Sequence, residues 1–159
     1  MEDGDKGRKV IEVGMFDAIN ISSSALTAQR VRMDVIAQNI ANANTTRTES
    51  GQPYRRKIVV FEERKQSFAD ILTQKIGEAA NSYYGGVRVK AILEDPSPFK
   101  KVYDPTHPDA DQNGYVNYPN VDIVTEMVNM IEASRSYEAN VTALNITKSM
   151  ITRTFEIGK

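Results

Sequence analysis

The sequence of 159 residues contains no cysteine, and it has a single histidine, His107. Without cysteine the chain can form no disulfide, no thiolate zinc site and no cysteine nucleophile. One imidazole with no thiolate beside it is a poor basis for a transition-metal site. The cellular compartment is left open, because a chain without cysteine is indifferent to redox conditions.

An excess of charge and a long apolar run are also missing. The formal net charge is −1 at pH 7, so no global field attracts the chain to DNA or to an acidic membrane. The densest basic cluster, Arg55-Arg56-Lys57 beside Tyr54, could contact nucleic acid, but a solvated strand edge that deters edge pairing is the simpler interpretation. No segment approaches the roughly 18 apolar residues that a membrane-spanning helix needs.

The first 14 residues alternate acidic and basic side chains and lack the continuous apolar region of a secretory signal. We expect them to be an extension that need not fold alone, with Met15 as an alternative start. If the protein leaves the cytoplasm, we expect a route that does not use a cleaved signal peptide.

Two stripes of apolar residues, each repeating every seven residues, lie at opposite ends of the chain. Such a repeat is typical of a helix seam that another helix must cover. The first helix is predicted over residues 16–43 with Asp17 as its N-cap, and the last from a cap at Asn120 to about Ile157. Few charged residues occur in the first helix, which indicates contacts on several sides. The expected core and interface positions are Ile19, Leu26, Met33, Ile36, Asn39, Ile40, Asn42, Met127, Met130, Tyr137, Val141, Leu144, Ile151 and Phe155.

The middle of the chain has the pattern of short strands. Residues 54–61 and 87–93 are rich in β-branched and aromatic residues and predict two strands that pair antiparallel, with a long excursion over residues 62–82. Residues 95–120 are rich in proline and aspartate and form a fixed loop, in which residues 102–103 and 115–116 can add short strands.

These elements predict an α+β fold that is mainly α, with an antiparallel coiled coil of the terminal helices. The expected domains are an extension (1–14), a helical axial core (15–46 and 120–159) and a small β-rich lobe (47–119).

Two alternative functions depend on the loop. Asp109, Asp111, Asn113 and Gly114 match the first half of a calcium-binding loop, but Asn120 stands where a bidentate glutamate is needed. The alternative is a turn in which the Asp and Asn side chains bond their own backbone and Gly114 takes positive φ. A hydrolase that uses His107 with Asp104 or Asp109 is a further hypothesis.

Three motifs resemble those of the bacterial flagellar axial proteins, the rod and hook family. Residues 24–34 and the following residues 35–45, with Asn39-Ile40-Ala41-Asn42 as the most recognisable part, resemble the N-terminal signature of that family. Residues 102–111, 114–116 and 118–121 resemble the narrower signature of its rod protein C branch, the proximal-rod subunits. Residues 126–140 are similar to its C-terminal helix.

The resemblance implies a structural subunit, not an enzyme, with no cofactor, no small-molecule substrate, no nucleic-acid partner and no direct membrane insertion. It implies export by the flagellar type III apparatus and helical polymerisation in the periplasm-spanning rod of the basal body. The implied partners are copies of the chain itself, other proximal and distal rod proteins, and the adaptor between the export gate and the MS ring. The loop at residues 109–114 becomes a feature of the family and not a metal site.

Overall fold

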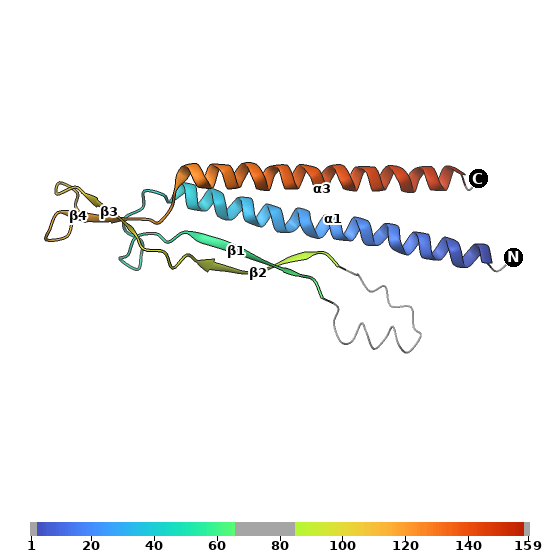
Figure 1. Cartoon of the computed structure of the whole chain (residues 1–159), viewed down its shortest axis with the longest axis horizontal. Coiled ribbons are helices and arrows are strands. Elements are labelled where there is room, and N and C mark those ends of the chain that lie inside the picture. Colours follow the sequence, from blue (N-terminus) through green and yellow to red (C-terminus); the bar gives the residue numbers. More distant parts are fainter. Residues whose placement is uncertain (1–2, 66–84, 158–159) are drawn as a thin grey trace. The chain divides into compact units, whose positions relative to one another are not determined.

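A computed structural model describes residues 3–65 and 85–157 of the chain. In this part of the chain the fold is α+β, as predicted: two long helices and two small two-stranded sheets. Figure 1 shows the helices α1 (Asp3–Ala41) and α3 (Ile123–Ile157) with the strands β1 (Lys57–Glu63), β2 (Val87–Glu94), β3 (Lys100–Tyr103) and β4 (Tyr115–Tyr118).

Helix α1 begins at Asp3, well before the predicted start at residue 16. The prediction was wrong because it took the end of the apolar stripe as the end of the helix, whereas the helix continues through the polar residues 3–14. A helix that is already nucleated gains a hydrogen bond with each added residue, and here it continues although the segment contains three glycines. Asp17 is therefore an interior residue and does not cap the helix.

Helix α3 is capped by Asp122 and not by the predicted Asn120. The Asp122 carboxylate accepts a hydrogen bond of 3.1 Å from the backbone N–H of Thr125, which is the usual N-cap geometry. This bond lowers the pKa of Asp122 below its ordinary value. The described part of the helix runs to Ile157, the predicted end.

Strands β1 and β2 form the predicted antiparallel pair. The N–H of Arg64 donates to the carbonyl of Gly86, and the N–H of Asp95 donates to the carbonyl of Arg56, so the chain directions are opposed. Alternate residues of β2 from Val87 to Ala91 are half-buried, as the sequence pattern predicted. Most of the predicted excursion between the strands, over residues 62–82, lies outside the described residues.

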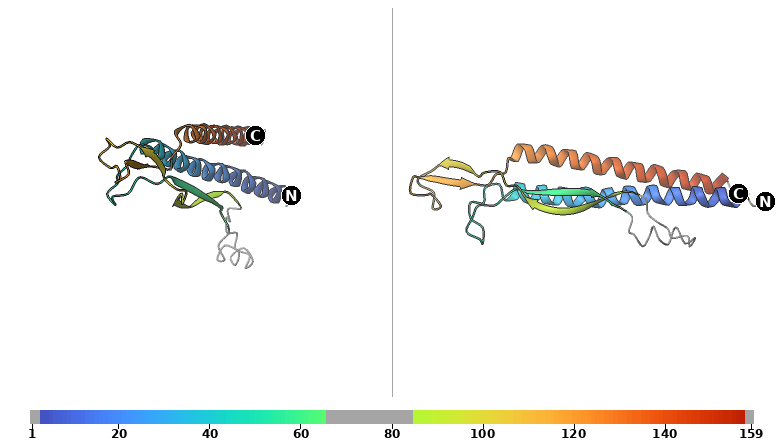
Figure 2. Two further views of the ribbon diagram at one scale, coloured as in Figure 1. Left: turned by 60° about the vertical axis from the view of Figure 1, so that its left-hand side comes forward. Right: turned by 60° about the horizontal axis from the view of Figure 1, so that its bottom comes forward.

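The short strands β3 and β4 pair antiparallel (Figure 2). Val102 lies opposite Val116, and Tyr103 lies opposite Tyr115. The rings of Tyr103 and Tyr115 meet edge to face with their centroids 5.3 Å apart. Val116 is fully buried, whereas the residues of β3 are exposed, so this hairpin contributes only one face to the core.

The chain divides into two compact units. Unit 1 contains Met1–Gln29, Phe61–Arg88 and Arg135–Lys159, and unit 2 contains Arg30–Val60 and Val89–Ser134. Among the described side chains of unit 1, Ala28 alone is buried, whereas unit 2 holds the other buried residues. In unit 1, Ser24 accepts a hydrogen bond from the N–H of Val87, and Gly86 lies against the same hydroxyl. Neither helix, over its described residues, has an apolar stretch of the kind that crosses a membrane.

Candidate functional site: a buried polar node and an exposed helix face

Asn39, on the last turns of α1, is 1% exposed and has all its hydrogen-bonding capacity used. Its amide nitrogen donates to the carbonyl of Lys57 and to the carboxylate of Glu126, both at 2.9 Å. Its oxygen accepts from the hydroxyl of Tyr54 and from the N–H of Lys57, both at 2.9 Å. One side chain of α1 is thereby bonded to β1 and to α3.

Glu126, in the first turns of α3, is also 1% exposed. One carboxylate oxygen accepts the bond from Asn39, and the other accepts two from Arg56, at 2.9 Å from Nε and 2.7 Å from Nη2. A buried carboxylate is tolerated only when it is paired and hydrogen-bonded, and this one is both.

Arg56 extends the contacts to two further segments. Its Nη1 lies 3.4 Å from Asp95 after β2, and its backbone N–H donates to the side chain of Asn120 at 2.8 Å. We call Tyr54, Arg56, Asn39 and Glu126 the polar node. It joins α1, β1, the end of β2 and the start of α3, all within unit 2.

Burial and charge within the node shift the pKa values of Tyr54 and Arg56. Burial, followed by the negative charges of Glu126 and Glu94, raises the pKa of Tyr54. Burial alone lowers the pKa of Arg56, but the hydrogen bond and the charge of Glu126 outweigh this effect and raise it. Both residues therefore keep their ordinary protonation states, and every strong donor and acceptor is occupied within the fold. The node can hold structure together but offers no group for acid–base chemistry.

The basic cluster Arg55-Arg56-Lys57 was predicted to be a solvated strand edge. Two of its residues, Arg55 and Arg56, do not have that role. The side chain of Arg56 is only 26% exposed and belongs to the node. Arg55 lies over the ring of Phe99, 4.4 Å from its centroid, and donates to the carbonyl of Asp95. These two arginines are occupied by contacts within unit 2.

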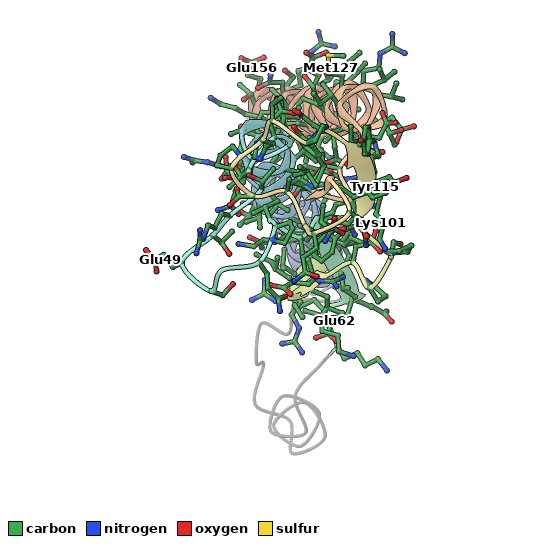
Figure 3. All side chains as sticks on the ribbon, turned by 90° about the vertical axis from the view of Figure 1, so that its left-hand side faces the viewer. Glu49, Glu62, Lys101, Tyr115, Met127 and Glu156 are labelled. Carbon is green, nitrogen blue, oxygen red and sulfur yellow. The ribbon has the colours of Figure 1, made fainter. Side chains whose placement is uncertain are left out.

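The outer face of α3 in unit 2 is apolar and exposed. Val124, Val128 and Ile131 have exposed fractions of 66%, 52% and 55%, and Met127 beside them is 48% exposed. Figure 3 shows Met127 projecting outward from the helix. The spacing of 124, 128 and 131 places the three branched residues on one helical stripe, which we call the outer stripe. A stripe of this kind is typical of a surface that another helix covers.

The expected core and interface positions differ in burial. Ile36 and Asn39 are buried, while Met127 and Phe155 are exposed. The remaining expected positions are half-buried: Ile19, Leu26, Met33, Ile40, Asn42, Met130, Tyr137, Val141, Leu144 and Ile151. The most buried apolar positions of α1 include Ala28 and Val35, which lie away from the predicted stripe.

Glu126, Arg56 and Tyr54 were not predicted as site residues. A signal for Glu126 was present, because positions 126, 130, 133 and 137 follow the same spacing as the half-buried side of α3. A carboxylate on that side has to find a buried partner. The sequence does not show that the partners are Arg56 and Asn39, which lie far away along the chain.

The loop between β3 and β4 forms the predicted turn. The Asp111 carboxylate accepts from the backbone N–H groups of Asn113 and Tyr115, and Gly114 has φ of 77°. Asp109 accepts from the hydroxyl of Thr46 and lies 3.6 Å from Arg47. Over residues 3–65 and 85–157 there is no cluster of three or more acidic, histidine or cysteine side chains that could hold a metal ion.

His107 and the carboxylate of Asp104 form hydrogen bonds with different partners. The His107 Nδ1 atom accepts from the backbone N–H of Asp109 at 3.1 Å. Asp104 accepts from the N–H and the hydroxyl of Thr106, and these bonds lower the pKa of Asp104. The hydrolase hypothesis requires a hydrogen-bonded histidine–carboxylate pair, and these contacts do not form one.

Comparison with known proteins gives the same family at both ends of the chain. Residues 19–47 match the family model described as flagella basal body rod protein, and residues 112–157 match the one described as flagellar basal body rod FlgEFG protein C-terminal. The flagellar basal-body rod protein FlgC of Bacillus subtilis is 51% identical over 148 residues, covering 91% of this chain and 98% of the relative. The FlgC proteins of Borreliella burgdorferi and Salmonella typhimurium are 48% and 43% identical, covering 87% and 92% of this chain and 93% and 100% of the relatives. With such identity over nearly the whole length, the chain belongs to the FlgC family of flagellar basal-body rod proteins.

Proposed function

We propose that this chain is a structural subunit of the proximal part of the bacterial flagellar rod, where it polymerises helically with other rod proteins around the export channel. Membership of the FlgC family supports this proposal. The single structural observation that carries it is the outer stripe, because an exposed row of Val124, Val128 and Ile131 is unfavourable in water and favourable in a subunit contact. Repeated contacts between unlike faces build an open helical assembly and not a closed ring.

In this assembly the terminal helices form an antiparallel coiled coil. Support comes from two contacts in unit 2, Asn39 with Glu126 at 2.9 Å and Arg32 with Glu132 at 3.7 Å. The residue numbers rise along one helix while they fall along the other, as expected for antiparallel neighbours. The half-buried residues at heptad spacing, such as Tyr137, Leu144 and Ile151, continue the coiled-coil face toward the C-terminus.

The helical segments 15–46 and 120–159 then act as the axial packing domain, residues 47–119 as a β-rich lobe, and residues 1–14 as an extension of the first helix. The predicted core and interface residues from Ile19 to Phe155 keep those roles within the proposal. Beside the outer stripe lies a groove of about 310 Å³, lined in part by Val102, Val121 and Ile123. It gives a neighbouring subunit a recess next to the exposed row.

The partners in the proposal are copies of this chain, other rod proteins and the adaptor between the export gate and the MS ring. The location is the periplasm-spanning rod of the basal body, which the chain reaches by type III export without a cleaved signal peptide. No chemical step is required of the chain in this role.

The test is a substitution in the outer stripe. Val128→Asp places a charge on a side chain that is 52% exposed, so the stability of the isolated chain should change by no more than about 0.5 kcal/mol. Cells that carry this variant should export it normally but should fail to build rods and to swim. Val128→Ile is the matched control and should swim, because it preserves the apolar surface. Normal motility of the Val128→Asp strain would contradict the proposed contact.

A further inference from the structure

The buried apolar side chains of the two helices in unit 2 are too similar in size and shape to specify how α1 is aligned along α3. The buried apolar residues of the two helices in unit 2 are small or aliphatic: Val35 and Ile36 in α1, and Ala133 in α3. Aliphatic faces that repeat every three or four residues pack about equally well after a displacement by one helical turn. Apolar packing alone therefore leaves several alignments of similar free energy.

The polar node separates these alignments. A displacement of one turn, about 5.4 Å, would move Glu126 out of reach of the Asn39 amide and of Arg56. The carboxylate would stay in a buried position without its partners, and an unpaired buried charge is strongly unfavourable. Asn39 would lose an acceptor at the same time, whereas in the observed alignment its four bonds are all made.

The node also fixes β1 against the helices. Asn39 bonds both the N–H and the carbonyl of Lys57, so it is sensitive to the position of the strand backbone along α1. Arg56, one residue earlier, brings its guanidinium to Glu126 on α3. A shift of the strand by one residue would turn the Arg56 side chain to the other face.

We infer that Asn39, Arg56 and Glu126 are positioning residues that select a single alignment of α1, α3 and β1. Their contribution is specificity of alignment more than stability, because a buried ion pair replaced by apolar groups of similar size often costs the fold little. Since α3 carries the outer stripe, the node sets where Val124, Val128 and Ile131 stand relative to the rest of unit 2. This inference concerns the isolated chain, and its test does not depend on the proposed function.

Because the full-length chain contains no cysteine, spin labels can be attached selectively at introduced cysteines. Spin labels on Arg30→Cys and Thr125→Cys, two exposed positions in unit 2 that are offset along the helix axes, report the alignment by double electron–electron resonance. The parent chain should give one narrow distance. The double substitution Arg56→Met with Glu126→Met leaves one N–H of Asn39 without its acceptor, so it should keep cooperative thermal unfolding with a Tm within about 10 °C of the parent. Its distance distribution should at least double in width or gain a second peak displaced by about one turn, roughly 5 Å.

The matched control is Arg32→Met with Glu132→Met. It removes a pair of opposite charges between the same helices, but one whose side chains are 32% and 62% exposed, and it should leave the distance unchanged. A distribution in the Arg56/Glu126 variant as narrow as that of the parent would overturn the inference, because another feature would then select the alignment. Loss of cooperative unfolding in that variant would also overturn it, because the node would then supply stability and not specificity.

Discussion

Replacing Glu126 with alanine should be among the most destabilising single substitutions in unit 2. The change removes a carboxylate that is 1% exposed and leaves the Arg56 guanidinium and the Asn39 amide short of acceptors. Breaking a buried ion pair by removing one partner costs about 3–5 kcal/mol. The Arg56 side chain is 26% exposed and still has Asp95 nearby, so we expect the lower value, about 3 kcal/mol.

This loss is large against the total of about 5–15 kcal/mol that holds an ordinary domain together. For a unit of this size each kcal/mol lowers Tm by about 4–8 °C, so Tm should fall by about 12–24 °C. Urea and thermal unfolding followed by circular dichroism measure both quantities. Glu132→Ala, on the same helix but 62% exposed, is the control and should cost less than about 1 kcal/mol. A loss below 1 kcal/mol for Glu126→Ala would refute the view that its charge is buried and paired.

Two further predictions concern single positions. Gly86→Ala should destabilise the chain by about 1–3 kcal/mol in urea unfolding, because Gly86 has φ of +105° and a Cβ there would lie 2.6 Å from the Ser24 hydroxyl. Gly51→Ala, at φ of +77° in open space, should cost less; an equal cost would show that the contact with Ser24 is unimportant. The lowered pKa of Asp122 predicts that the first turn of α3 has its full stability above the ordinary value of 3.8 and loses it as the pH falls through the lower, folded value. The protection of the Thr125 amide against hydrogen exchange, relative to its intrinsic rate at each pH, should therefore fall in acid in the parent but not in Asp122→Asn, which caps without titrating. The same acid dependence of protection in both proteins would contradict this assignment.

Much of the fold follows from local patterns in the sequence. The heptad spacing predicts both helices, and the β-branched segments predict the strands and their antiparallel pairing. The turn at Asp111 and Gly114 was predictable because Asp and Asn bond their own backbone in such loops. Helix starts were predicted poorly. Helix α1 continues beyond its apolar stripe to Asp3, and Asn120 and Asp122, two residues apart, are both suitable caps for α3.

The polar node could not be predicted, because it depends on contacts between distant segments. The sequence indicates that Asn39 belongs to a family motif, but it does not show the four partners that make a buried asparagine stable. The role of Arg56 was misjudged for the same reason. A basic cluster before a strand is usually solvated, and only the position of Glu126 on a distant helix turns it into a buried pair.

The most direct test of the central claim is a cryo-electron microscopy map of basal bodies that contain this chain. The account predicts that the chain lies in the proximal rod and that a neighbouring subunit covers Val124, Val128 and Ile131. A map in which the chain occupies the rod with these three side chains facing open solvent, or in which it is absent from the rod, would contradict the account.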